Sequence, residues 1–184
     1  MTDQMDFSEL KPLIRPRIVA IADIGFYGQA KDSPDGNFKI AWGEASDYSD
    51  KGLYVLLKNG VVAAMVPGKY PLEAVVANNG IFVVHDRTNK QALAHTVITY
   101  NHSGQELFRQ AFRRLPAASW ISPDGKFFAV QTANGLKGGA IFVLFDVEQG
   151  REIYRVKDTW CKDVVFSGNC VQIDGKTITM DKLK

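Results

Sequence analysis

The sequence has little that could support cross-linking, membrane insertion or strong charge attraction. Only two cysteines, Cys161 and Cys170, occur among 184 residues. The turn that begins at Ser167 would place Phe166 rather than Cys161 opposite Cys170, so we expect two thiols and no disulfide. No stretch approaches the roughly 20 apolar residues that span a bilayer. The 22 basic and 20 acidic residues leave a formal charge of +2, too small for a strong global attraction to nucleic acid or to an anionic membrane.

The first ten residues also lack the basic and apolar regions of a secretory signal, so a soluble cytoplasmic protein without membrane contact is expected. Motifs of known chemistry are missing as well: the sequence has no nucleophile elbow, phosphate loop, dinucleotide fingerprint or paired-cysteine zinc pattern. The three histidines, His85, His95 and His102, do not have a spacing that specifies a metal site. We therefore expect no metal and no cofactor.

A regularly spaced turn motif is the strongest positive signal. Ser33-Pro34-Asp35-Gly36 returns as Ser122-Pro123-Asp124-Gly125, and weaker copies begin at Ala77 and Ser167. Successive copies begin 44, 45 and 45 residues apart, a period in the range of propeller blades. Serine and aspartate can hydrogen-bond the turn's own backbone, proline fixes φ early in the turn, and glycine accepts the positive φ that follows. The motif is therefore interpreted as structural.

Each repeat has room for four short strands rich in β-branched and aromatic residues. In the third repeat we expect strands over 117–121, 127–131, 140–146 and 151–156, which would form a four-stranded meander. One segment permits another interpretation, because Ser103-Gly-Gln-Glu106 resembles a helix capping box and is followed by apolar residues at helical spacing. Residues 104–109 nearly repeat at 150–155, where no helical pattern follows, and this favours a strand.

Three segments of the third repeat carry a family resemblance: Trp-Ile-Ser-Pro-Asp-Gly-Lys-Phe-Phe-Ala-Val-Gln at 120–131, Ile-Phe-Val-Leu-Phe-Asp at 141–146 and Gly-Arg-Glu-Ile-Tyr at 150–154. Together they resemble a WD40-like repeat of the TolB propeller type, most clearly over residues 117–156. The match is fair over 33–66 and weak over 72–112 and 161–181, and no repeat ends in Trp-Asp. The resemblance implies a β-propeller, usually of six to eight blades, and carries no catalytic residue across.

These patterns predict an all-β fold: a small β-propeller of about four four-stranded blades, with repeats at about 25–66, 67–112, 113–157 and 158–184. The last repeat is one strand short, and residues 17–22 form an unassigned strand. We therefore expect that N-terminal strand to complete the C-terminal blade and close the ring within a single domain, 17–184. Residues 1–16 would be a tail, either loose or docked through its apolar residues. Two chains sharing one larger ring remain an alternative, so the expected state is monomer or homodimer.

Propeller geometry places the loops between blades opposite the Ser-Pro-Asp-Gly turns. That face would gather aromatic and basic residues, the composition that interface hot spots favour. The candidate binding residues are Tyr27, Tyr48, Tyr70, Arg87, Arg113, Arg114 and Trp160.

The favoured function is a non-enzymatic protein-binding module or scaffold, of which an inhibitor or immunity-type protein is one specific form. The alternative is a hydrolase or lyase acting on a sugar or small ester at the central channel, because propeller enzymes gather catalytic groups from separate blades. No catalytic residue is assigned. A basic-aromatic cluster over 109–114 could meet phosphates, but without a second cluster it gives little support for nucleic-acid binding.

Overall fold

A computed structural model describes residues 17–45, 52–89, 91–134 and 139–183, which form sixteen strands in four antiparallel sheets. The first sheet contains β1 (Arg17–Ile21), β2 (Phe26–Asp32), β3 (Phe38–Ala45), β4 (Gly52–Lys58) and β5 (Val61–Gly68). The second contains β6 (Tyr70–Val76), β7 (Phe82–Arg87), β8 (His95–Tyr100) and β9 (Glu106–Phe112). The third contains β10 (Pro116–Ile121), β11 (Phe127–Thr132), β12 (Ile141–Asp146) and β13 (Arg151–Lys157). The fourth contains β14 (Val164–Ser167), β15 (Cys170–Ile173) and β16 (Lys176–Thr179).

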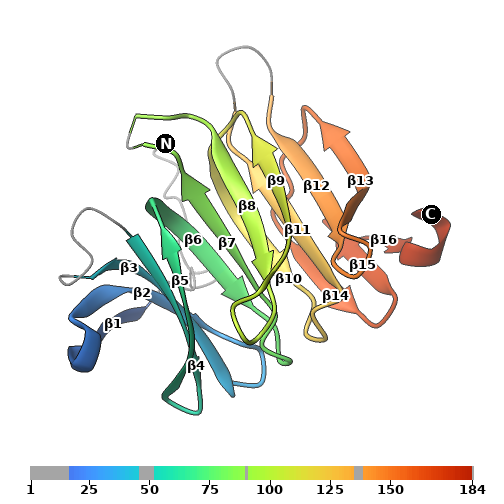
Figure 1. Cartoon of the computed structure of the whole chain (residues 1–184). Helices are drawn as coiled ribbons and strands as arrows, with labels where there is room; N and C mark the ends of the chain where they lie inside the picture. Colours follow the sequence, from blue (N-terminus) through green and yellow to red (C-terminus); the bar gives the residue numbers. More distant parts are fainter. Residues whose placement is uncertain (1–16, 46–51, 90, 135–138, 184) are drawn as a thin grey trace, which may run out of the picture.

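The sheets follow one another across the molecule, from the blue and teal first sheet to the orange and red fourth sheet (Figure 1). Two short 3-10 helices, η2 (Ala22–Ile24) and η3 (Met180–Leu183), flank this array. The prediction of an all-β chain with four meander units is confirmed. The tail assigned to residues 1–16 lies outside the described residues.

The predicted closure of a ring by the N-terminal strand is wrong. β1 pairs with β2, with Arg17 opposite Ala30, and is the fifth strand of the first sheet instead of the fourth strand of the last. The reason is local: η2 and Gly25, which has a φ of 57°, turn the chain straight back on itself. So short a connection favours pairing with the neighbouring strand over pairing across the molecule. Within the described ranges, no ladder joins the first sheet to the fourth.

The segment that carried a possible helix signal is a strand. Residues 106–112 form β9, which pairs with β8 along its length. Gly104, at a φ of 81°, closes the hairpin turn between the two strands. The strand interpretation is therefore confirmed, and the sheet ladder overrides the local helical spacing.

Both cysteines are thiols in the structure. Cys161 is buried and Cys170 is half-buried. Ser167, rather than the predicted Phe166, lies opposite Cys170, because the β14–β15 turn is one residue tighter than expected.

The Ser-Pro-Asp-Gly turns have the predicted internal hydrogen bonds. In the third sheet, Ser122 Oγ accepts the Phe127 N–H at 3.0 Å and donates to Asp124 Oδ1 at 2.7 Å. The same carboxylate oxygen accepts the Lys126 N–H at 3.1 Å, and Gly125 has a φ of 74°. The turn at 33–36 repeats the two serine bonds and the positive φ of its glycine. The motif therefore stabilises the first hairpin of both sheets.

Turns of successive sheets also bind one another. The Asp35 N–H donates to Asn78 Oδ1 at 3.0 Å, which joins the turn of the first sheet to that of the second. The Asn78 N–H donates to the Pro123 carbonyl at 2.9 Å, and Asn79 Nδ2 donates to the Asp124 carbonyl at 2.7 Å. These bonds fix the order and spacing of three sheets at one end of the molecule.

Replacement of Asp124 by alanine is expected to lower the free energy of unfolding by about 1 kcal/mol, because two hydrogen bonds of the turn are lost while the backbone stays partly solvated. Urea denaturation measures this change. Glu148→Ala is the matched control, since Glu148 is exposed near a neighbouring turn, and a shift within about 0.5 kcal/mol is expected for it. An equal loss in both variants would show that the turn bonds contribute nothing.

The apolar core lies between neighbouring sheets. One cluster joins the first and second sheets through residues such as Trp42 and Phe82, and a second joins the second and third sheets around Phe128 and Phe145. A third cluster joins the third and fourth sheets, and a fourth lies on the other face of the first sheet. The aromatic rings of Phe128 and Phe145 stack with centroids 4.6 Å apart. Packing of this extent holds neighbouring sheets in fixed positions relative to one another.

The outer edges of the first three sheets differ in composition. β9 and β13 contain charged residues, including the ion pairs Glu106–Arg109 and Glu152–Arg155. β5 has the sequence Val-Val-Ala-Ala-Met-Val-Pro-Gly and contains no charge. Val61 is 71% exposed and Met65 is 43% exposed. β5 therefore presents an uncharged apolar edge to solvent.

Candidate functional site

The connections between sheets gather at the end of the molecule opposite the Ser-Pro-Asp-Gly turns. From β2 onward, the first strand of each sheet starts at this end, and successive strands of a sheet run in opposite directions. We call this end the inter-sheet face. It comprises Lys69, the turn at 113–115 and the connection at 158–163, with the β15–β16 turn beside them. Of the predicted binding residues, Tyr48 lies outside the described residues, and the other six lie at this end.

The six residues differ in accessibility. Tyr27 is 62% exposed and Trp160 is 52% exposed. Arg113 is exposed, whereas Arg114 is half-buried and donates from Nη1 to the Gly139 carbonyl. Tyr70 and Arg87 are half-buried and lie opposite each other at the ends of β6 and β7. Tyr27, Arg113 and Trp160 are thus the accessible members of the predicted set, and the other three are partly built into the scaffold.

Carboxylates at the inter-sheet face bind backbone amides. Asp86 accepts the N–H groups of Lys69 and Tyr70, each at 2.8 Å. Asp158 accepts the Gly139 N–H at 2.8 Å. Asp174 accepts the N–H groups of two residues of the 158–163 connection, Lys162 at 2.9 Å and Asp163 at 3.0 Å. These carboxylates therefore stabilise loops through hydrogen bonds with the backbone.

The cations at the same face are left accessible. Four exposed side chains make no ion pair with any residue in the described part of the chain: Lys69, Arg113, Lys157 and Lys162. These exposed cations lie at the same end of the molecule as the exposed rings of Tyr27 and Trp160.

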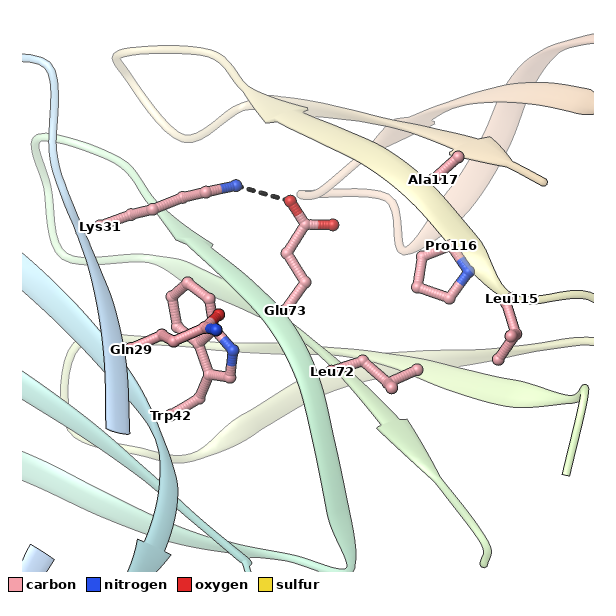
Figure 2. A pocket seen from close by; sticks show the side chains of 8 residues that line it. All are labelled: Gln29, Lys31, Trp42, Leu72, Glu73, Leu115, Pro116 and Ala117. Atoms are coloured by element: carbon pink, nitrogen blue, oxygen red, sulfur yellow. Dashed lines mark hydrogen bonds and ion pairs between the residues drawn. The ribbon is translucent and has the colours of Figure 1, made fainter. Parts of the chain in front are cut away.

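A pocket lies where β2, β3, β6 and the start of β10 meet, and we call it the axial pocket (Figure 2). Its volume is about 340 Å³. The lining residues are Gln29, Lys31, Trp42, Leu72, Glu73, Leu115, Pro116 and Ala117. Because Leu115 belongs to the turn at 113–115 and Leu72 is the third residue of β6, the pocket lies close to the inter-sheet face.

A chain of polar contacts leads from the axial pocket into the interior. Lys31 Nζ lies 2.5 Å from Glu73 Oε1, and these side chains are only 25% and 18% exposed (Figure 2). The other carboxylate oxygen accepts the Ser119 hydroxyl at 3.2 Å. Ser119 Oγ also lies 2.7 Å from His85 Nε2. Three sheets thus contribute to one network, since Lys31 is on β2, Glu73 on β6 and Ser119 on β10.

The buried end of this network consists of two stacked histidines. The ring centroids of His85 and His95 lie 5.1 Å apart, and the His95 ring also stacks on Phe112 with a centroid distance of 5.1 Å. Burial, followed by the nearby His95 and Lys31, lowers the pKa of His85 well below its ordinary 6.5. Burial lowers the pKa of His95 to about 4, against an opposing contact with the Arg114 carbonyl. Both imidazoles are therefore neutral near pH 7.

This network differs from a nucleophile–base–acid arrangement. In such an arrangement the carboxylate holds the histidine, which takes the proton of the nucleophile. Here the Glu73 carboxylate binds Ser119, while His85 Nδ1 is buried and has no hydrogen-bond partner in the described part of the chain. No group of three or more metal-ligating side chains occurs in the described part of the chain either. A polar network of this geometry lies beside the axial pocket.

The sequence carries a periodic signal for these residues. Glu73 lies 42 residues after Lys31, and Ser119 lies 46 residues after Glu73. Both separations are close to the turn period, so polar residues recur at nearly equivalent positions of the strands that line the axial pocket. Recurrence of polar side chains within apolar strands could have identified the network.

None of the described helices is long and apolar enough to cross a membrane. No protein-family model matches the chain, and no curated protein matches it. Solved structures do resemble it. An uncharacterised protein from Listeria monocytogenes aligns with a TM-score of 0.57 at 12% identity. The alignment covers 85% of this chain and 47% of the Listeria protein.

A second similar structure is the β-propeller domain of the trilobed protease from Pyrococcus furiosus, which is described as having an open velcro topology. It aligns with a TM-score of 0.53 at 10% identity, over 80% of this chain and 48% of the protease structure. A prolyl endopeptidase structure aligns with a TM-score of 0.52 at 15% identity, over 78% of this chain and 23% of the endopeptidase chain. The chain thus spans between 23% and 48% of the length of these structures. At such identities the likeness shows the fold alone. The chain has a propeller-type fold whose four sheets correspond to blades.

Proposed function

We propose that this protein is a non-enzymatic protein-binding module whose inter-sheet face receives an acidic segment of a partner protein. The observation that carries the proposal is the unequal use of charges at that face. Asp86, Asp158 and Asp174 bind backbone amides, whereas Lys69, Arg113, Lys157 and Lys162 remain exposed without ion pairs among the described residues. Acidic side chains of a partner would form ion pairs with these cations.

The exposed aromatic residues support the same role. Trp160 and Tyr27 combine large apolar area with low conformational entropy, and arginine is the cation most enriched in interface hot spots. A rigid scaffold of packed sheets with accessible loops is an arrangement that suits binding. An inhibitor or immunity-type protein remains one specific form of this role. A monomer or homodimer in the cytoplasm, with one domain over 17–184, belongs to the same proposal.

Loss of binding in two variants tests the proposal. Tagged protein is used to isolate partners from native lysate, and the dissociation constant of an identified partner is then measured by calorimetry. Arg113→Glu and Trp160→Ala are each expected to weaken it about tenfold or more, the effect of a hot-spot residue. Arg151→Glu is the control, because Arg151 is an exposed arginine at the opposite end. A partner bound equally well by wild type and both test variants would overturn the proposal.

A hydrolase or lyase acting on a sugar or small ester is the second candidate, because Ser119, His85 and Glu73 converge beside the axial pocket. Its support is weaker, since Ser119 is only 8% exposed and no carboxylate orients His85 in the described part of the chain. Such an enzyme would lose turnover on Ser119→Ala, whereas a binding module would keep its affinity for a partner at the inter-sheet face.

A further inference from the structure

On the basis of the binding role proposed for the inter-sheet face, we propose that Gln131 and Asp174 hold Trp160 as a preformed anchor, which inserts into a concave apolar pocket of the partner protein. Trp160 belongs to the connection at 158–163, which joins β13 of the third sheet to β14 of the fourth. Two features of this connection support the proposal. Its backbone is fixed by side chains of the neighbouring sheets, and the ring that it carries packs into no core cluster.

Gln131 binds the backbone on both sides of Trp160. It is on β11 and is completely buried. Its Oε1 accepts the Cys161 N–H at 3.0 Å, and its Nε2 donates to the Thr159 carbonyl at 3.2 Å. An unpaired amide in the interior is costly, so both ends of this side chain require their partners. Gln131 therefore fixes the position of the one residue that lies between them.

Asp174 fixes the second half of the connection. It lies in the β15–β16 turn and accepts the N–H groups of Lys162 at 2.9 Å and Asp163 at 3.0 Å. Its own N–H donates to the Asp163 carbonyl at 3.0 Å. The Cys161 side chain is buried in the cluster between the third and fourth sheets. Successive residues of the connection are thus bound to the scaffold, although the connection forms no strand.

The Trp160 ring has no such attachment among the described residues. It is 52% exposed, belongs to none of the core clusters, and makes no hydrogen bond or ring contact in that part of the chain. The other two tryptophans pack in or against core clusters, Trp42 between the first two sheets and Trp120 between the last two. A ring on a fixed backbone has only two χ angles left to order on binding, so its entropy cost is low.

The accessibility of Trp160 indicates the shape of the surface that it fits. Thr159 is half-buried and Cys161 is buried, so the ring is more accessible than either neighbour. A flat surface would cover one side of such a ring, whereas a pocket covers both and buries more apolar area. Lys157 and Lys162 are exposed near the two ends of the connection, so the acidic segment of the partner would border this pocket.

Backbone relaxation, measured by NMR on the purified protein without a partner, tests the positioning role. The Trp160 amide is expected to be rigid, with an order parameter of about 0.85. In Gln131→Met, which has a side chain of similar length but neither bond, the value should fall below about 0.6. Gln110→Met is the matched control, because Gln110 is exposed on β9. A mobile Trp160 amide in wild type, or equal values in wild type and Gln131→Met, would overturn the proposal.

Substitutions of Asp174 decide the question if Gln131→Met does not fold. Asp174 has a φ of 47°, which glycine and asparagine both tolerate. Asp174→Gly removes the acceptor and should lower the order parameter of the Trp160 amide. Asp174→Asn keeps an acceptor oxygen and should preserve it. Equal order parameters in these two variants would contradict the proposal.

Affinities for the partner protein that is isolated to test the proposed function examine the anchor. Gln131→Met should weaken binding about tenfold in wild type, because Trp160 must then be ordered on binding, and less than about twofold in Trp160→Ala. Trp160→Phe leaves part of a pocket unfilled and should weaken binding about tenfold, whereas a loss of about twofold or less would indicate a flat contact and overturn the pocket.

Equal weakening by Gln131→Met in both backgrounds would overturn the positioning role and leave the proposed function in place. An affinity that Trp160→Ala leaves unchanged would overturn the anchor. If Arg113→Glu leaves it unchanged as well, the proposed function also fails.

Discussion

Replacement of Glu73 by leucine is expected to lower the free energy of unfolding by about 2–3 kcal/mol. The carboxylate is the centre of a network that joins three sheets, and its loss leaves the Lys31 ammonium unpaired and the Ser119 hydroxyl with His85 as its remaining partner. The lower end of the range for buried ion pairs applies, because the two charged side chains remain 25% and 18% exposed. Urea denaturation monitored by tryptophan fluorescence measures the change.

A double variant separates the network from simple loss of packing. Removal of both charges in Lys31→Met/Glu73→Leu should restore most of the lost stability, because no unpaired charge is then left between the sheets. The coupling between the two substitutions is expected to be about 1–2 kcal/mol. A double variant that loses the sum of the two single effects would show that the ion pair does not hold the sheets together.

Acidification from pH 6.5 to pH 4 is expected to lower the free energy of unfolding by about 3 kcal/mol through His95 alone. Burial lowers the pKa of His95 from 6.5 to about 4 in the folded protein. Between these values the unfolded chain binds the proton and the folded chain does not, so stability rises with pH across this window. The loss begins as the pH falls below 6.5 and levels off below pH 4.

His85 acts in the same direction, since burial also lowers its pKa well below 6.5. His95→Phe keeps a ring between His85 and Phe112 and should reduce the slope of stability against pH. His102→Gln is the control, because His102 is exposed. The variants are compared above about pH 5, where carboxylates contribute little to the change in stability. The hydrogen bond from Arg109 lowers the pKa of Glu106, for example, so its protonation destabilises the protein only below about pH 4.5. An unchanged slope in His95→Phe would contradict the assignment.

The sequence predicted the features that depend on neighbouring residues. Ser122 and Asp124 identified a hairpin turn because both side chains bond their own turn, and the spacing to Ser33 indicated the number of sheets. The strand assignment of residues 106–112 came from comparison between repeats, and the ladder with β8 confirms it.

Features that depend on distant residues were predicted less well. The partner of β1 could not be inferred from its own composition, and the short turn through Gly25 determined it. The axial pocket requires residues from three sheets to be placed together, so Gln29 and Trp42 carried no sequence signal of their own. The six accessible or half-buried residues of the inter-sheet face were placed by topology, and their role as a binding surface remains a prediction.

The uncharged edge of β5 determines how this protein would aggregate. Residues 61–66 combine high β-propensity with neither charge nor proline, which is the signature of segments that stack into amyloid-like fibrils. β9 and β13 carry charged residues that oppose such pairing, whereas β5 itself carries none. At high concentration or on partial unfolding, association should therefore begin at β5, and a single lysine placed there would act as a gatekeeper.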